Sequence, residues 1–229
     1  MVRKLSEKPF AVRLPIWRSV IFVDWNGVLC NDVYWASIAN DAQHPLHERI
    51  NESRRRLFVE QRPLVDAWQR GEVSSEAIIR TFEIPLDRRC RDDYLLRRLQ
   101  RDCRNMRTDA TLLGAFAALP TDVCVVLATD NVDCFYEQLD AKPELQAVLS
   151  GALCSSAVGR LKSQDVIGFF KPWLDMHHLT FADAILLDDS PQNCRSFEAV
   201  GGTAIIYTAP EHAMELLRSW LAARPSANG

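Results

Sequence analysis

Short apolar stretches of this sequence end in side chains that can bind a metal ion or a phosphate group. The side chains are Asp24, Thr129 and the pair Asp188-Asp189, and Lys162 lies between the second and the third. Carboxylates that converge repel each other unless a cation lies between them, and hard oxygen ligands select magnesium. Magnesium, a lysine and a hydroxyl together neutralise and orient the oxygens of a phosphoryl group. These residue types therefore point to phosphoryl-transfer chemistry at a magnesium site.

Asp24 is the candidate nucleophile. Attack of its carboxylate on phosphorus gives an aspartyl-phosphate, which water hydrolyses in a second step. Each residue also has an ordinary structural explanation, because Asp24 precedes an Asn-Gly turn, Thr129 can cap a helix and Lys162 can be solvated. Their order, each at the end of an apolar stretch or in a loop expected at the same edge, favours the catalytic interpretation.

The apolar stretches have the length and composition of buried parallel strands. We expect strands at 20–23, 123–128, 184–187 and 204–207, with helical patterns between and after them, including 110–119 and 210–223. Strands that alternate with helices predict an α/β fold with a doubly wound parallel sheet. Ligands bind such sheets at the carboxyl ends of the strands, which is where the candidate residues lie.

Residues 30–108 have a different pattern. Apolar residues recur there at helical spacing, as in Ile50, Leu57 and Phe58, and Ser74-Ser75-Glu76 resembles a helix start. We therefore expect an inserted all-helical domain at 30–108 and an α/β core made of 1–29 plus 109–229. The insertion holds most of the arginines and no lysine. Most of these arginines should pair with acids on solvated helix faces, whereas one or two can bind phosphate or carboxylate in a cleft.

Composition excludes several other classes of function. The 229 residues carry a net charge of −3, which gives no general attraction to nucleic acid or to an anionic membrane. The seven cysteines form no Cys-x-x-Cys pair, which argues against a zinc site and a disulfide framework. No long apolar run precedes Pro15. We therefore expect a cytoplasmic protein whose partner is a small phosphorylated substrate, and the sequence does not indicate an oligomeric state.

Four stretches together resemble the motifs of the haloacid dehalogenase (HAD) superfamily. They are Asp24-Trp25-Asn26-Gly27-Val28, Leu127-Ala128-Thr129, Lys162 within Ser155-x-x-x-Gly159-x-x-Lys162, and Leu186-Leu187-Asp188-Asp189-Ser190-x-x-Asn193. The resemblance covers about residues 20–207 and implies a Rossmann-like core.

This resemblance also implies roles for individual residues. Asp24 would be the nucleophile and a magnesium ligand, and Asn26 would offer its backbone carbonyl to the metal. Asp188 would complete the metal site, and Asp189 would support it. Thr129 and Lys162 would hold the phosphoryl group, with Asp130 and Asn131 beside them in the substrate site. The helical insertion would be a mobile cap that closes over the site and selects substrates.

Asn26 departs from the usual pattern of the family's phosphatases, which carry a second aspartate at this position as general acid and base. An amide cannot exchange that proton, and loss of such a group costs about 10²–10⁴ in rate. A slow phosphatase, a phosphotransferase and a non-catalytic ligand- or protein-binding protein therefore all stay open. Family members that cleave carbon–phosphorus bonds resemble this chain in having Trp after the nucleophile, but they rely on a lysine in the cap. The insertion here has none, which disfavours that activity. Carbon–halogen hydrolysis ranks low because Asp188-Asp189 suits a cation.

Overall fold

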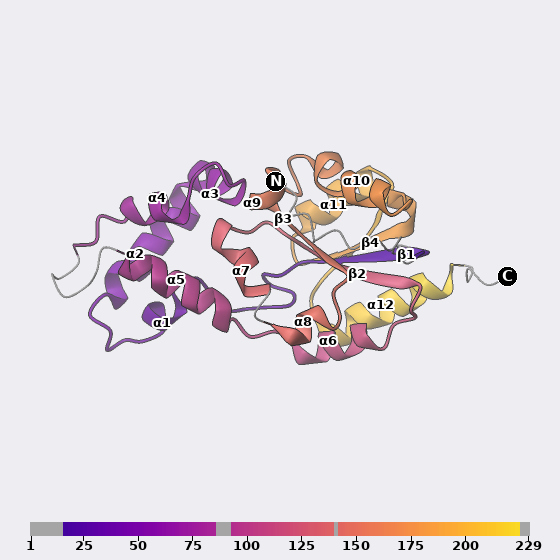
Figure 1. Cartoon of the computed structure of the whole chain (residues 1–229), viewed down its shortest axis with the longest axis horizontal. Coiled ribbons are helices and arrows are strands. Elements are labelled where there is room, and N and C mark those ends of the chain that lie inside the picture. Colours follow the sequence, from indigo (N-terminus) through magenta and orange to yellow (C-terminus); the bar gives the residue numbers. More distant parts are fainter. Residues whose placement is uncertain (1–15, 86–92, 140–141, 225–229) are drawn as a thin grey trace, which may run out of the picture.

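The computed structural model describes residues 16–85, 93–139 and 142–224, and its centre is a parallel sheet of five strands (Figure 1). The sequence predicts an irregular lead-in at 1–17 and a frayed end at 225–229, and most of the first and all of the second lie outside the described residues. The strand order is β3-β2-β1-β4-β5. The strands are β1 (Ser19–Val23), β2 (Val123–Thr129), β3 (Gly151–Cys154), β4 (Ala184–Asp188) and β5 (Thr203–Ile206). The α/β class and the parallel sheet predicted from the sequence are confirmed.

Alternate residues of the strands face two layers of helices. Ile21 and Val23 belong to the apolar cluster that includes α6 (Ala110–Ala117) and α12 (Pro210–Ala222). Val20 and Phe22 belong to a second cluster with α10 (Val166–Met176) and α11 (Pro191–Ala199), on the opposite face (Figure 1). Burial on both faces explains why the strands are continuous apolar runs.

The four strands expected from the sequence are all present, within one residue at each end. β3, at the edge of the sheet, was only an unassigned apolar piece in the sequence, since its side chains are half-buried and its run is short. Shorter helical elements complete the core. They are η2 (Asp133–Phe135), α7 (Tyr136–Leu139), α8 (Pro143–Gln146), α9 (Ser155–Val158) and η3 (Phe181–Asp183). None of the described helices is long and apolar enough to cross a membrane.

The segment between β1 and α6 is helical and lies beyond one end of the sheet (Figure 1). We call its elements the helical insert: α1 (Ala36–Ala39), α2 (His47–Arg55), the π-helical turn η1 (Arg56–Glu60), α3 (Arg62–Gln69), α4 (Ser75–Arg80) and α5 (Tyr94–Asn105). Ile50, Leu57 and Trp68 are buried, and Phe58 packs against them partly exposed. Ser74 caps α4 by accepting a hydrogen bond from Ala77, as the sequence predicts.

Asp133 of the core connects the helical insert to the loop after β2. Its carboxylate accepts hydrogen bonds from the backbone N–H of Ser75 at 2.9 Å and from Trp68 Nε1 at 3.3 Å, and it also contacts the Ser75 hydroxyl. Trp68 and Ser75 are buried, so these donors have little access to water. Polar contacts therefore attach the insert to the core near the carboxyl end of β2.

Replacement of Asp133 by alanine is expected to lower the free energy of unfolding by about 1–3 kcal/mol, because buried donors lose their acceptor. Chemical denaturation measures the loss, and limited proteolysis should show faster cleavage within 36–105. Asp175→Ala is the matched control, because Asp175 is exposed and pairs with the neighbouring Lys171 on the same helix. Equal stability and equal proteolysis of the two variants would contradict this account.

Candidate active site

The register of the sheet brings Asp24 and Asp188 together. Val23 of β1 is paired with Leu187 of β4, and the backbone N–H of Asp24 donates to the Leu187 carbonyl at 2.9 Å. The chain runs from β1 outward to β2 and β3 and then returns to the other side of β1 with β4. This change of direction is the position at which doubly wound sheets bind ligands. Both carboxylates therefore lie at the sheet's binding edge.

The ammonium group of Lys162 lies between these two carboxylates. Lys162 Nζ is 2.9 Å from Asp24 Oδ1 and 2.6 Å from Asp188 Oδ2, and it also donates to the Ala128 carbonyl at 3.1 Å. The Lys162 side chain is 1% exposed. Asp24 Oδ1 also accepts from the backbone N–H of Trp25, whereas Asp24 Oδ2 accepts no hydrogen bond from the described residues. One oxygen of Asp24 is thus held in place and the other is open.

Burial and neighbouring charge oppose each other at these groups. Burial and the nearby Asp188 together raise the pKa of Asp24 to about 7, against the attraction of Lys162. Burial alone would lower the pKa of Lys162, but Asp24, Asp188 and Asp130 outweigh it and hold that pKa above its ordinary value. Lys162 is therefore a permanent cation in a site with an excess of carboxylates.

Asp189 brings a third carboxylate to the same point. One oxygen from each of Asp24, Asp188 and Asp189 can be chosen so that all lie within 4.8 Å of one another. Burial and the charge of Asp188 raise the pKa of Asp189. One ammonium cannot balance these carboxylates, and their hard oxygen donors match the preference of magnesium. The donor set present in this chain therefore fits a divalent cation.

Gly27 allows Asp189 to approach the loop after β1. Gly27 has φ +78°, in the left-handed region, and a Cβ atom there would collide with the Asp189 carboxylate. The Asn-Gly pair that predicts a turn in the sequence thus also leaves room for a member of the acidic cluster.

The residues after β2 form a connected network. Thr129 and Asn131 are fully buried, and Asn131 Nδ2 donates to Thr129 Oγ1 at 3.3 Å. Asn131 Oδ1 accepts from the backbone N–H of Val132 at 3.0 Å. Asp130 Oδ1 accepts from the backbone N–H of Lys162 at 3.0 Å, so it positions the loop that carries this lysine. Direct contact of Thr129, Asp130 and Asn131 with a substrate stays a prediction.

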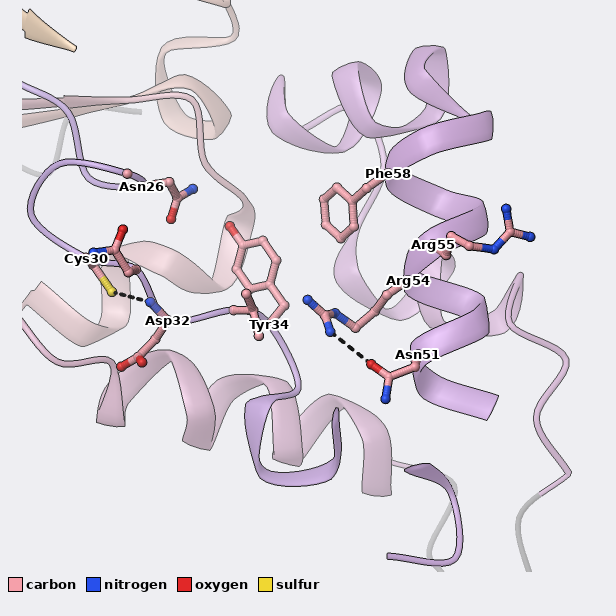
Figure 2. A pocket seen from close by; sticks show the side chains of 11 residues that line it. Asn26, Cys30, Asp32, Tyr34, Asn51, Arg54, Arg55 and Phe58 are labelled. Carbon is pink, nitrogen blue, oxygen red and sulfur yellow. Dashed lines mark hydrogen bonds between the residues drawn. The ribbon is translucent and has the colours of Figure 1, made fainter. Parts of the chain in front are cut away.

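Tyr34 was not identified from the sequence, yet it lies at the centre of the site. Its hydroxyl donates to Asn131 Oδ1 at 2.5 Å and points toward the side chain of Asn26 (Figure 2). Burial raises the pKa of Tyr34 well above its usual range, with the nearby thiols acting in the same direction, and Asn26 opposes this by hydrogen bonding. Nothing in the sequence around Tyr34 signals such a role.

Asn193 also supports the acidic cluster. Its side-chain amide lies 3.1 Å from each carboxylate oxygen of Asp188, and the backbone N–H of Ser190 donates to Asp188 Oδ1 at 2.9 Å. Asn193 belongs to the fourth stretch that resembles the family motifs, and its spacing from Asp188 is the sequence feature that could have indicated this contact. These donors fix the orientation of the Asp188 carboxylate.

A pocket of about 510 Å³ lies between the loop after β1 and the helical insert (Figure 2). Asn26 and Gly27 form part of its core side, and Tyr34, Arg54 and Phe58 are among the residues on its other sides. Its volume is in the range of small-molecule binding sites. The pocket thus adjoins the turn that follows Asp24.

No protein-family model and no curated protein sequence match this chain. Solved structures do resemble it. A predicted HAD-like family hydrolase from Porphyromonas gingivalis has 15% identity and a TM-score of 0.62, over 90% of this chain and 98% of that one. A HAD family enzyme from Bacteroides thetaiotaomicron, in complex with magnesium and inorganic phosphate, has 14% identity and a TM-score of 0.59, over 83% and 94%.

A 2-haloacid dehalogenase from Pseudomonas syringae pv. tomato is similar as well, with 15% identity and a TM-score of 0.58, over 89% of this chain and 98% of that one. At these identities the likeness establishes the fold. The chain therefore has the fold of HAD-family hydrolases, and the resemblance inferred from its motifs is confirmed at that level.

Replacement of Lys162 by methionine, without added divalent cation, is expected to lower the free energy of unfolding by about 3–5 kcal/mol, because Asp24 and Asp188 lose their buried partner. Urea denaturation at neutral pH in the presence of a chelator measures this loss. Lys171→Met is the matched control, because Lys171 forms an exposed pair with Asp175 and its loss should change stability little. Equal stability of the two variants would show that Lys162 does not hold the cluster together.

Proposed function

We propose that this protein is a magnesium-dependent phosphoryl hydrolase that acts on a small phosphorylated molecule, with Asp24 as nucleophile. The observation that carries this proposal is the convergence of Asp24, Asp188 and Asp189 within 4.8 Å, with the Lys162 ammonium between the first two. This arrangement combines an open carboxylate oxygen with cationic stabilisation at the binding edge of the sheet. Stabilisation of phosphoryl oxygens is the main requirement of phosphoryl-transfer catalysis.

Asp24, Asp188 and Asp189 are the side chains that would hold magnesium, together with the backbone carbonyl of Asn26. Bound magnesium would supply positive charge to the phosphoryl oxygens and reduce the repulsion among these carboxylates. The complex of the similar Bacteroides thetaiotaomicron enzyme with magnesium and inorganic phosphate supports this assignment.

In the proposed reaction, Asp24 attacks phosphorus, and Trp25 and Lys162 orient its carboxylate. A bond forms between an Asp24 oxygen and phosphorus while the bond from phosphorus to the leaving oxygen breaks, and water then cleaves the acyl phosphate to regenerate Asp24. The N–H of Trp25 and the ammonium of Lys162 hold Asp24 Oδ1 and keep Oδ2 open. Lys162 also favours the ionised, nucleophilic form of Asp24, against the effect of burial.

The leaving group receives no proton from Asn26, because an amide does not act as an acid at neutral pH. Tyr34 does not supply this proton either, since its pKa is raised and its hydroxyl donates to Asn131. We therefore expect that the site prefers phosphate esters whose leaving group departs as a stable anion, and that alkyl phosphates react slowly.

We further propose that residues 30–108 act as a cap over the core formed by 1–29 and 109–229. The pocket between Asn26 and the helical insert supports this division, because a ligand bound there contacts both parts. In this division, the contacts of Asp133 with Trp68 and Ser75 would join the cap to the core.

The experiments described below also test two alternative functions. Carbon–halogen hydrolysis is suggested by the similar 2-haloacid dehalogenase, but it gives no reason for an acidic cluster around Asp188 and Asp189. A non-catalytic binding protein is favoured by Asn26, which removes the usual acid.

The purified protein with magnesium is expected to hydrolyse 4-nitrophenyl phosphate, and Asp24→Asn should abolish turnover. Removal of magnesium by a chelator should also abolish it. Release of nitrophenolate measures the activity, and halide release from 2-bromopropionate tests the dehalogenase alternative. Trapping with beryllofluoride should give an adduct at Asp24 that Asp24→Asn lacks. Absence of both turnover and adduct, or halide release alone, would overturn the proposal.

Replacement of Asn26 by aspartate is expected to increase phosphatase activity, by up to about 10²–10⁴ for alkyl phosphates, because a general acid and base is restored. The increase should be smaller for 4-nitrophenyl phosphate, whose leaving group needs no proton. Steady-state kinetics of both substrate types measure the difference. Asn31→Asp, at an exposed residue that lines the same pocket, is a control for added negative charge and should give no gain. An equal gain for both substrate types would exclude a leaving-group role for position 26.

A further inference from the structure

The pocket beside Asn26 contains a cation that pairs with no acid in the described part of the chain. The guanidinium of Arg54, from α2, points into the pocket, whereas the side chain of Arg55 points away from it (Figure 2). Arg55 pairs outside with Glu52 and Glu60, at 2.8 and 2.5 Å. Arg55 is therefore neutralised by acids, whereas no carboxylate of the described residues neutralises Arg54.

Arg54 has few contacts of its own. Its NH1 group donates to Asn51 Oδ1 at 3.2 Å, and its Nε atom is buried without a hydrogen-bond partner. Among the described residues no carboxylate forms an ion pair with Arg54. Asp32, the acid that lines the same pocket, is bound instead by the backbone and side chain of Arg107. Burial lowers the pKa of Arg54, without a compensating acid.

An unpaired, half-buried cation is costly unless a ligand compensates it. The planar fork of a guanidinium matches a carboxylate, with which it can form paired hydrogen bonds. The side chain of Asn51 is fixed by donating to the Ala39 carbonyl at 3.0 Å, so its Oδ1 can orient Arg54. Arg55 also lines the pocket, but its guanidinium points away, so Arg54 is the one cation that the described residues orient into it (Figure 2). A single guanidinium matches a monoanion better than a second phosphate.

The rings of Phe58 and Tyr34 supply apolar surface in the same pocket. They are stacked, with centroids 6.0 Å apart and planes 14° from parallel, and both line the pocket. Their surfaces suit an apolar or aromatic linking group. A ligand would thus contact the turn after Asp24 at one end, the rings in its middle and Arg54 at the other end.

We propose that Arg54 determines substrate specificity by binding a carboxylate, so that the substrate is a phosphate monoester that also carries a carboxylate group. The assignment of the phosphoryl end rests on the function proposed above. The carboxylate end rests on the pocket alone, and the two can fail separately.

Binding of phosphonates, which cannot be hydrolysed in this way, tests the proposal without turnover. Isothermal titration calorimetry with magnesium compares 4-carboxybenzylphosphonate with its neutral analogue 4-carbamoylbenzylphosphonate. We expect the carboxylate to bind at least tenfold more tightly. A second, flexible pair of probes is 5-phosphonopentanoate and its terminal amide. Its chain can adapt the distance between phosphonate and carboxylate, and it should show the same preference.

Arg54→Gln should reduce the preference to less than twofold while leaving the affinity for the neutral analogue within about threefold. Arg54→Lys should retain part of it, because the charge remains but the planar fork is lost. Arg55→Gln is the matched control and should keep the full preference. Thermal unfolding of each variant establishes that it is folded.

The outcomes separate the two proposals. Equal binding of the charged and neutral probes by the wild-type protein, absence of binding by either pair, or a preference that survives Arg54→Gln would each overturn the role of Arg54. Turnover of 4-nitrophenyl phosphate with no carboxylate preference would leave only the proposed hydrolase function standing. A carboxylate preference that depends on Arg54, without turnover or an Asp24 adduct, would leave the pocket as a ligand-binding site and overturn the hydrolase function.

Discussion

The ion pairs of Lys162 with Asp24 and Asp188 are the interactions on which the rest of the site depends. Parallel pairing of β1 with β4 forces these carboxylates together in the interior, where their repulsion is costly. The ammonium reaches them from a separate loop, which Asp130 holds by accepting from the Lys162 backbone. Removal of the lysine would therefore disturb the sheet edge as well as any ligand site. Stability and chemistry are coupled at the same atoms, because the charges that would hold a phosphoryl group are also those that must be neutralised for the chain to fold.

The sheet and the acidic cluster were predictable because their signals are local and repeated. Continuous apolar runs predict buried parallel strands, and the topology then places Asp24, Asp188 and Asp189 at one edge. β3 was not recognised as a strand, because it is short and half-buried at the sheet edge. The position of Lys162 between Asp24 and Asp188 needed the structure, since nothing in its loop sequence sets the direction of the side chain.

The pocket could not be predicted from sequence for a related reason. The run Arg54-Arg55-Arg56 predicts a solvated helix face, and Arg55 follows that expectation by pairing with Glu52. Helical geometry turns Arg54 by roughly 100° from its neighbour, and the packing of α2 against the segment around Tyr34 then decides that it enters the pocket. Tyr34 likewise acquires its place through contact with Asn131, which is 97 positions away in the sequence. Such roles depend on tertiary contacts that no short motif encodes.

The Tyr34–Asn131 contact gives a physical context for Asn26. Tyr34 belongs to the segment that leads into the helical insert, and Asn131 belongs to the loop after β2, so their hydrogen bond connects both parts beside position 26. The Tyr34 hydroxyl is buried, and the neutral amide of Asn26 lies next to it. A carboxylate at position 26 would add a further negative charge close to Asp24 and Asp189. Among the described residues, Lys162 alone forms ion pairs with the acidic cluster. An amide avoids that repulsion and still places a polar group beside the tyrosine hydroxyl (Figure 2). Asn26 is thus compatible with the packing around Tyr34, whereas in the proposed reaction it would provide no proton to the leaving group.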